Sequence, residues 1–373
     1  MTQQNQNKNF PRFLRNDVPQ NDDRGCRHPE RSARIQFLKQ GVSKPLIIWL
    51  LTTALLIWLM IALGGATRLT HSGLSIVEWK PITGIIPPLT EPDWQKAFEA
   101  YQNYPEFKLV NYDMRLKDFK FIYLMEYAHR LLGRLIGLVF LVPLIVFWNQ
   151  QKLSATLKRR SLMILVLGAL QGFMGWYMVK SGLVKDPSVS HYRLTLHLSL
   201  AFWLLGLILW SLLEVIYPKQ NRPQNKLIWI AFTFQLITMI YGGLVAGLKA
   251  GLIYNTFPLM EGRWIPFEWA FHKPLWINFF ENAALVQWCH RVLALISLGF
   301  VWGCYFKTQK QSIIRIWALA VTIQGLLGVI TLLYQVPVSL GTIHQAWAVV
   351  VFGIGILCCF EGSYPMIREI RPK

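Results

Sequence analysis

Charged residues are scarce in this chain of 373 residues, and acidic residues are the scarcer kind. Asp, Glu, Lys and Arg make up only 15% of the sequence, whereas hydrophobic residues make up 53% and aromatic residues 14%. This composition excludes a disordered chain, a coiled coil and an ordinary soluble domain. The chain has five cysteines and no CxxC motif, which argues against a zinc site and against a disulfide scaffold.

The few charges that are present are mostly positive. Lys and Arg number 38 against 19 Asp and Glu, which gives a formal net charge of +19. Such an excess suits either nucleic acid or a membrane protein, and the apolar composition decides for the membrane, where Lys and Arg collect on cytoplasmic loops. We therefore expect a lipid bilayer around the protein and no nucleic-acid partner.

Eight apolar segments are long enough to cross a bilayer, which takes about 20 residues in a helix. One charge-free stretch, 316–360, is too long for a single helix, and Gln335-Val336-Pro337 is a natural break within it. The eight spans are therefore expected within 45–67, 121–148, 161–179, 194–213, 227–248 and 282–306, and on either side of the break in 316–360.

The charges of the loops predict the orientation. The first 44 residues contain nine Lys or Arg, and the loops after the second, fourth and sixth spans are also basic. The positive-inside rule then places both termini in the cytoplasm. Residues 1–44 have no apolar core and so do not form a signal peptide, and their polar composition predicts disorder. Asp22, Asp23 and Glu30 argue against a mitochondrial transit peptide, so we expect a bacterial inner (plasma) membrane rather than a mitochondrial one.

The loop between the first two spans, 68–120, is long enough to fold. Thr90 is a plausible N-cap for a short helix that carries Trp94, Phe98 and Tyr101. We expect a folded cap on the outer side of the membrane, with a passive loop as the alternative.

The two halves of the chain resemble each other. Four landmarks recur in the same order, which is a strong sign of an internal repeat. The pairs are Gly64-Gly65 with Gly242-Gly243, His129-Arg130 with His290-Arg291, Gln171-Gly172 with Gln324-Gly325, and His197 with His344.

The repeat predicts the fold. Each half has an even number of spans, so the halves run parallel. We expect an all-α integral membrane protein whose eight transmembrane helices form two pseudo-symmetric four-helix bundles. The expected boundaries are a basic N-terminus at 1–44, bundles at 45–216 and 217–362, and a cytoplasmic tail at 363–373.

Each even-numbered span carries one histidine in the outer half of the membrane. Polar groups there are costly and usually functional; the alternative, a plain interhelical hydrogen bond, explains four repeat-related histidines poorly. Two imidazoles on facing helices can ligate one metal. Zinc needs more ligands, whereas haem iron needs two and an apolar slot. We expect one haem in each bundle, held by the pairs His129 with His197 and His290 with His344.

Charged residues next to these histidines suggest further roles. Arg130 and Arg291 directly follow their histidines, where they can pair with haem propionates or reach the membrane interface. Glu126 stands three residues before His129, but the matching residue before His290 is Gln287. A carboxylate there can shuttle protons or stabilise a developing positive charge, or pair with the arginine four residues on. We expect the N-terminal site to be the reactive one.

These residues resemble the haem A synthase family over roughly 45–362. The specific motif is EYAHRLLGR at 126–134. Supporting matches are GGATRLT at 64–70, SGLS at 72–75, His197, QWCHR at 287–291 and TIHQ at 342–345.

The resemblance implies an activity and a set of roles. His290 and His344 would bind haem b as a cofactor, and His129 and His197 would lie at the haem O substrate site. Glu126 would lie beside the methyl group that is oxidised to a formyl group through an alcohol, with oxygen from water. The product, haem A, serves terminal oxidases.

The resemblance also implies a branch and partners. One branch of the family has two cysteines in the first outer loop, and this chain has none there, so it is similar to the proteobacterial and mitochondrial branch. Haem O synthase and an electron-transfer protein would be partners, and a homo-oligomer is left open.

Three other functions compete. A dihaem cytochrome b-like electron carrier acting on quinones usually has two histidines on one helix at two depths, unlike this pattern. The prenyltransferase that makes haem O needs clustered aspartates that bind magnesium and diphosphate. The predicted spans contain no such cluster of aspartates. A transporter suits parallel repeats but does not require four ligand-like histidines.

Overall fold

The structure is a computed structural model that describes residues 44–79, 83–184, 187–217, 225–308 and 312–361. The basic N-terminus predicted to be disordered and the predicted cytoplasmic tail lie outside the described residues. Within those ranges the chain is helical apart from loops, and its only β contact is an isolated bridge between Met260 and Arg263.

Eight of the described helices are long and apolar enough to cross a membrane, as predicted. The longest, α5, has 34 residues and is therefore about 50 Å long at 1.5 Å per residue, well beyond the ~30 Å hydrocarbon core. The eight are α2 (Lys44–Leu69), α5 (Leu116–Asn149), α6 (Ala155–Gly182), α7 (His191–Ile216), α8 (Lys226–Gly247), α10 (Ala283–Lys307), α11 (Ser312–Leu333) and α12 (Val338–Glu361).

These helices expose apolar side chains over much of their length. Val166 of α6 is 67% exposed, Trp203 of α7 is 62% exposed and Leu326 of α11 is 58% exposed. Apolar surface on this scale is unfavourable in water and favourable against lipid. The chain is therefore a multi-pass membrane protein.

The break between α11 and α12 lies where the sequence predicts it. Gln335 and Val336 have φ of 59° and 57°, in the left-handed region that a β-branched residue rarely adopts. The Val336 N–H donates to the carbonyl of Thr331 at 2.8 Å, which ends α11 and lets Pro337 precede α12.

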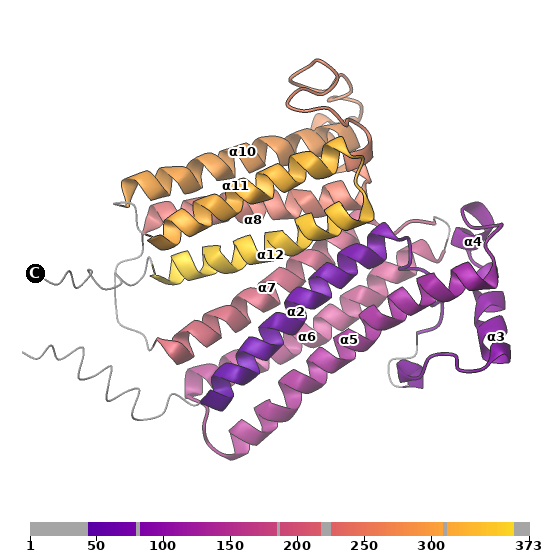
Figure 1. Cartoon of the computed structure of the whole chain (residues 1–373), viewed down its shortest axis with the longest axis horizontal. Helices are drawn as coiled ribbons and strands as arrows, with labels where there is room; N and C mark the ends of the chain where they lie inside the picture. Colours follow the sequence, from indigo (N-terminus) through magenta and orange to yellow (C-terminus); the bar gives the residue numbers. More distant parts are fainter. Residues whose placement is uncertain (1–43, 80–82, 185–186, 218–224, 309–311, 362–373) are drawn as a thin grey trace, which may run out of the picture. The chain divides into compact units, whose positions relative to one another are not determined.

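The helices of the second half pack mainly on one another, whereas the first half also packs extensively against the second, and four helices join the halves. The second half closes on itself, because α8 packs against α10 and α12, and α11 packs against both of those helices. In the first half α6 lies between α5 and α7, and the Trp49 indole of α2 donates to the Phe140 carbonyl of α5 at 3.2 Å. The halves meet where α7 packs against α8 and α12. In the view of Figure 1, α7 is drawn between α2 and α12.

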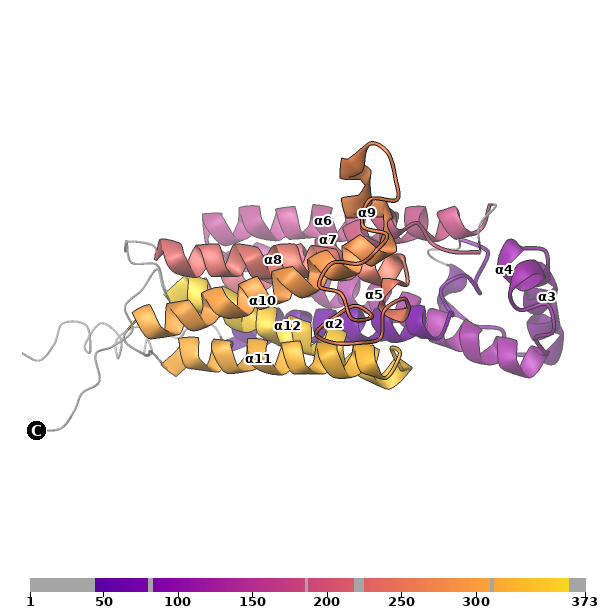
Figure 2. The ribbon, with the colours of Figure 1, turned by 90° about the horizontal axis from the view of Figure 1, so that it is seen from above.

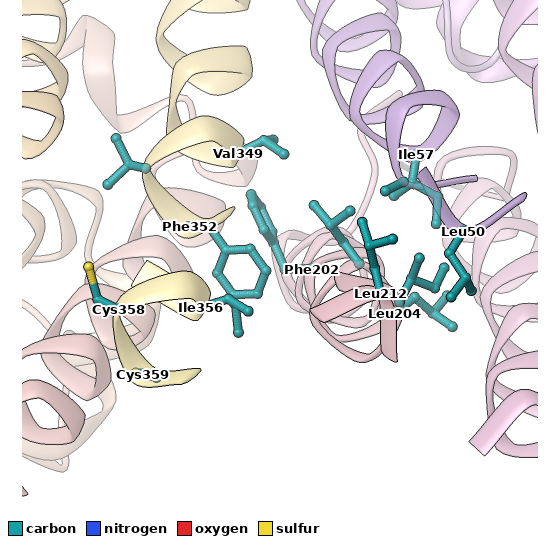
Figure 3. Close-up of a cluster of buried hydrophobic side chains, with 14 of the residues drawn as sticks. Leu50, Ile57, Phe202, Leu204, Leu212, Val349, Phe352, Ile356, Cys358 and Cys359 are labelled. Carbon is teal, nitrogen blue, oxygen red and sulfur yellow. The ribbon is translucent and has the colours of Figure 1, made fainter. Parts of the chain in front are cut away.

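Further contacts between the halves join α2 to α12 and α8. The Trp58 indole donates to the Ala346 carbonyl at 3.0 Å, the Gln345 amide donates to the Ile61 carbonyl at 2.7 Å, and Arg68 donates to the Ala246 carbonyl at 3.0 Å. The main hydrophobic core lies at this junction (Figure 3), where the rings of Phe202 and Phe352 meet edge to face at 5.3 Å.

The segments that join α2 to α5 and α8 to α10 lie at the same end of the spans (Figures 1 and 2). The first contains η1 (Thr83–Ile85), α3 (Glu91–Gln102) and α4 (Pro105–Leu109), and the second contains η2 (Ala250–Leu252), η3 (Leu275–Ile277) and α9 (Asn278–Glu281). Thr90 caps α3 in a capping box with Asp93, and Phe98 and Tyr101 pack with Phe119 of α5 in a buried cluster. The predicted folding of this loop is confirmed, and its position on the outer side of the membrane stays a prediction.

Close packing between the halves predicts an effect of Gly247→Ala. A Cβ at Gly247 of α8 would lie 2.5 Å from the Cα and Cβ of His191 in α7, so the two helices must separate. We expect thermal unfolding in detergent to show a loss of about 1–3 kcal/mol. The control is Gly303→Ala in α10, where a Cβ meets nothing within 4 Å; alanine should be neutral there or stabilise by up to ~1 kcal/mol. Equal melting of the two variants would contradict the close contact.

Candidate functional site

Each of the four predicted ligand histidines packs against a glycine of a neighbouring helix. A Cβ built at Gly64 would lie 3.0 Å from Cε1 of His129, and one at Gly242 would lie 3.2 Å from Cε1 of His290. The imidazoles of α5 and α10 therefore occupy equivalent places in the two halves, where a Cβ on the facing glycine would crowd the ring.

The histidines of α7 and α12 show the same arrangement. The Cβ position of Gly175 lies 3.3 Å from Cε1 of His197, and that of Gly328 lies 3.0 Å from Cε1 of His344. The sequence repeat identifies Gly64 and Gly242 but not this second pair. The spacing in the sequence could have identified this pair, since each of these glycines lies four residues after a repeated glutamine.

Those glutamines hold the histidines of α7 and α12. The side-chain amide of Gln171 donates to the His197 carbonyl at 3.1 Å and lies 3.4 Å from Nε2 of the ring. Gln324 donates to the His344 carbonyl at 3.1 Å and lies 3.3 Å from Nδ1 of that ring. The repeated Gln-Gly landmarks therefore act on the same pair of histidines in both halves.

The histidines of α5 and α10 differ in how they are held. Nδ1 of His290 lies 3.0 Å from the Thr238 carbonyl, and a ring that donates through Nδ1 is fixed in orientation and has Nε2 free to bind a metal. Nδ1 of His129 is buried and has no hydrogen-bond partner among the described residues. The second-half site is therefore the more firmly built of the two.

The two histidines of each half lie near each other, His129 with His197 and His344 with His290. Across the described ranges, no group of three or more His, Cys, Asp or Glu side chains could hold a metal ion. Two partly buried imidazoles per half, set beside glycines among apolar helices, fit a group whose iron needs two axial ligands. The residues present therefore fit a haem in each half.

Glu126 lies beside the first histidine pair and is only 3% exposed. Its Oε2 accepts hydrogen bonds from the Ser75 hydroxyl at 2.7 Å and from the Ile76 N–H at 2.8 Å. Its Oε1 accepts two from Arg130, at 3.0 Å from Nε and 2.6 Å from Nη2. The ion pair predicted as one alternative is therefore present, and it leaves a carboxylate with a fixed orientation.

Arg130 also holds the chain that follows α2. Its guanidinium donates to the carbonyl of Ile76 at 2.9 Å and to that of Glu78 at 3.2 Å, and it lies 5.4 Å from the centre of the Trp79 ring. Arg130, Glu78 and Trp79 also line a cavity of about 280 Å³, together with Trp176 and Lys180 at the end of α6. Pairing of Arg130 with a propionate stays a prediction.

The second half repeats this network without the carboxylate. Gln287 is also 3% exposed, but its amide donates to the carbonyls of Ala250 at 2.7 Å and Tyr254 at 3.3 Å. Arg291 donates to Oε1 of Gln287 at 2.9 Å and to the carbonyls of Tyr254 and Thr256, both at 2.8 Å. The halves thus share a scaffold, but Glu126 adds an acid–base group to only one of them.

Comparisons with known proteins find a family model and named relatives that match most of this chain. Residues 47–356 match the model of the COX15-CtaA family, described as cytochrome oxidase assembly protein. A protein of Wolbachia pipientis wMel named heme A synthase is 45% identical over 317 residues, covering 83% of this chain and 91% of the relative. Proteins of the same name from Flavobacterium johnsoniae and Nitrosospira multiformis are each 43% identical, covering 82% and 84% of this chain and 94% and 92% of their own lengths.

Proposed function

Because the chain belongs to the COX15-CtaA family, we propose that it is a haem A synthase, an oxidoreductase that converts a methyl group of haem O to a formyl group through an alcohol. The observation that supports this reaction is the difference between the two halves. Glu126 presents a buried, oriented carboxylate beside the first histidine pair, whereas Gln287 presents an amide beside the second.

The two pairs of histidines then have separate roles. We assign His290 and His344 to a resident haem b, since the contact between His290 and Thr238 supports permanent binding. We assign His129 and His197 to the iron of haem O. The unpaired Nδ1 of His129 suits a site whose occupant must enter and leave. Haem b supplies one-electron redox chemistry when bound.

The stoichiometry of the reaction explains why the first half needs an acid–base group. Converting a methyl group and one water into a formyl group releases four electrons and four protons. A carboxylate beside the reacting carbon stabilises positive charge on it and accepts a proton from the attacking water. Ser75, Ile76 and Arg130 hold Glu126 in one orientation, so little reorganisation is needed as charge develops.

The same chemistry defines the partners. An electron-transfer protein must remove the electrons, and haem O synthase must supply the substrate; both remain proposals, as does a homo-oligomer. The basic loops support a bacterial inner membrane with cytoplasmic termini. The side of the membrane that carries α3 and α4 would then be the outer side.

The test is production of the full chain with and without a source of haem O, followed by chromatography of the extracted haems. We expect a hydroxylated haem or a haem with a formyl group, together with haem b. A protein that contains only haem b and leaves haem O unchanged would instead support the dihaem electron carrier.

A further inference from the structure

A second carboxylate is buried on the same half of the molecule, outside the spans. Glu106 of α4 is 5% exposed, and its Oε2 accepts a hydrogen bond from the Tyr101 hydroxyl at 3.0 Å. Tyr101 of α3 is fully buried, and its hydroxyl accepts a hydrogen bond from the Asn111 amide at 2.8 Å. The cap therefore encloses a carboxyl group within a chain of hydrogen bonds.

The cap sits on the face of α5 that leads to Glu126. The Tyr101 ring stacks on Phe119 at 5.2 Å. Phe119, Ile122 and Glu126 are all buried and follow the i, i+3, i+7 spacing of one helix face. The rise from Phe119 to Glu126 is about 10 Å. One hydroxyl, that of Ser75, contacts both the Ile122 carbonyl at 3.2 Å and Oε2 of Glu126 at 2.7 Å.

The surroundings of Glu106 bring the pKa of its carboxyl group close to neutral pH. Burial raises the pKa of Glu106 to about 7, and the negative charge of Glu126 adds to this rise. The hydrogen bond from Tyr101 and the positive charge of Lys249 oppose it. These are the charged and titratable groups that act on Glu106 from α3, α5 and the segment after α8.

The second half has no such pair of buried carboxylates among its described residues. Tyr254 there donates to Glu268, but Glu268 is exposed, and the hydrogen bond holds the pKa of that carboxyl below its ordinary value. The residue that matches Glu126 is Gln287, which takes up no proton. The buried pair therefore occurs in the half that carries the reactive carboxylate.

We propose that Glu106 is a proton relay for Glu126: it accepts the protons that Glu126 takes up at the substrate site and releases them to water on the side that carries α3 and α4. Each transfer returns Glu126 to its carboxylate form and protonates Glu106, whose proton then leaves. Tyr101 and Asn111 position the relay. The inference rests on the proposed function, which is the source of the protons.

The first test needs no activity. Infrared spectra over a pH series report the protonated carboxyl groups of the full chain in detergent. We expect a carboxyl band that titrates near pH 7 in the wild type and in the control Glu99→Gln, which changes an exposed acid of α3. The part of the band that belongs to Glu106, measured as the difference from the wild type, should be missing in Glu106→Gln. In Glu126→Gln it should titrate at lower pH, because a negative charge that raises the pKa of Glu106 is gone. An unchanged titration in Glu126→Gln would overturn the coupling.

The second test measures turnover of haem O against pH. Glu106→Gln should lower turnover about 10- to 100-fold, less than the ~10²–10⁴-fold effect of a direct general base, with haem content and substrate KM retained. Tyr101→Phe keeps the ring on Phe119 but removes a hydrogen bond that lowers the pKa of Glu106. In this variant, the rise of turnover with increasing pH should therefore occur at higher pH. A merely structural role of Tyr101 would not produce this shift.

The outcomes separate the two proposals. A wild type that oxidises haem O while Glu106→Gln keeps its rate and pH profile overturns the relay alone. A wild type that leaves haem O unchanged overturns the proposed function, and the relay with it.

Discussion

Glu126→Gln is expected to abolish oxidation of haem O while the haem content stays at the wild-type level. Glutamine keeps the size of the side chain and removes its charge and its basicity. A buried carboxylate that stabilises charge and accepts a proton contributes on the order of 10²–10⁴-fold to a rate. A glutamine keeps an oxygen that accepts from Arg130, as Gln287 accepts from Arg291 at 2.9 Å. Its NH2 group loses the bond that Oε2 of Glu126 accepts from the Ile76 N–H, so the haem content serves as the check that the fold is kept.

Chromatography of extracted haems measures the loss of product, and absorption spectra of the purified protein measure the haem that remains. The matched control is Glu91→Gln, which removes an exposed carboxylate whose partner is Lys120 and should leave turnover unchanged. Full turnover of Glu126→Gln would show that the reaction does not use this carboxylate.

The elements of the fold follow closely from the sequence. The length of the apolar segments predicts all eight spans. In a bilayer, a helix is the simplest structure in which all backbone N–H and C=O groups are hydrogen-bonded. Gln335-Val336-Pro337 predicts the break in the last apolar stretch, and Thr90 predicts the start of α3, since both depend on local backbone chemistry.

The contacts between helices could not be predicted in the same way. These helices are apolar on all sides, so no polar face indicates how each is rotated. The contact of Trp58 with the Ala346 carbonyl joins residues 288 positions apart, and the bond from Ser75 to Glu126 spans 51 positions. Such pairs depend on the rotation and depth of each helix, which sequence periodicity leaves open.

The candidate site also has residues that the sequence predicts and residues that it does not. The repeat identifies the four histidines and Glu126 because they are polar exceptions in apolar segments. Glu106 has no such signal, since an acidic residue in a loop is usually solvated. Its burial arises only when the aromatic residues of α3 and α4 fold onto α5.

Arg130→Met is expected to destabilise the protein by about 3–5 kcal/mol, the cost of leaving a buried charge without its partner. The side chains of Arg130 and Glu126 are only 14% and 4% exposed, so water cannot replace the lost hydrogen bonds. The control is Arg291→Met in the second half, whose partner Gln287 is neutral. Its loss should be about 1–3 kcal/mol, the range for an unsatisfied neutral group. Thermal unfolding of both variants without added haem O measures the difference.

The double variant Glu126→Gln and Arg130→Met decides between the two roles predicted for this arginine. If Arg130 mainly neutralises Glu126, removing both charges should recover much of the stability lost in Arg130→Met, because the uncompensated carboxylate is gone. If Arg130 mainly binds a propionate, Arg130→Met should weaken haem O binding with little effect on the haem-O-free protein, and the double variant should bind no better. Recovery of stability together with weakened haem O binding would show that one guanidinium does both, holding the carboxylate and the substrate in a fixed relation.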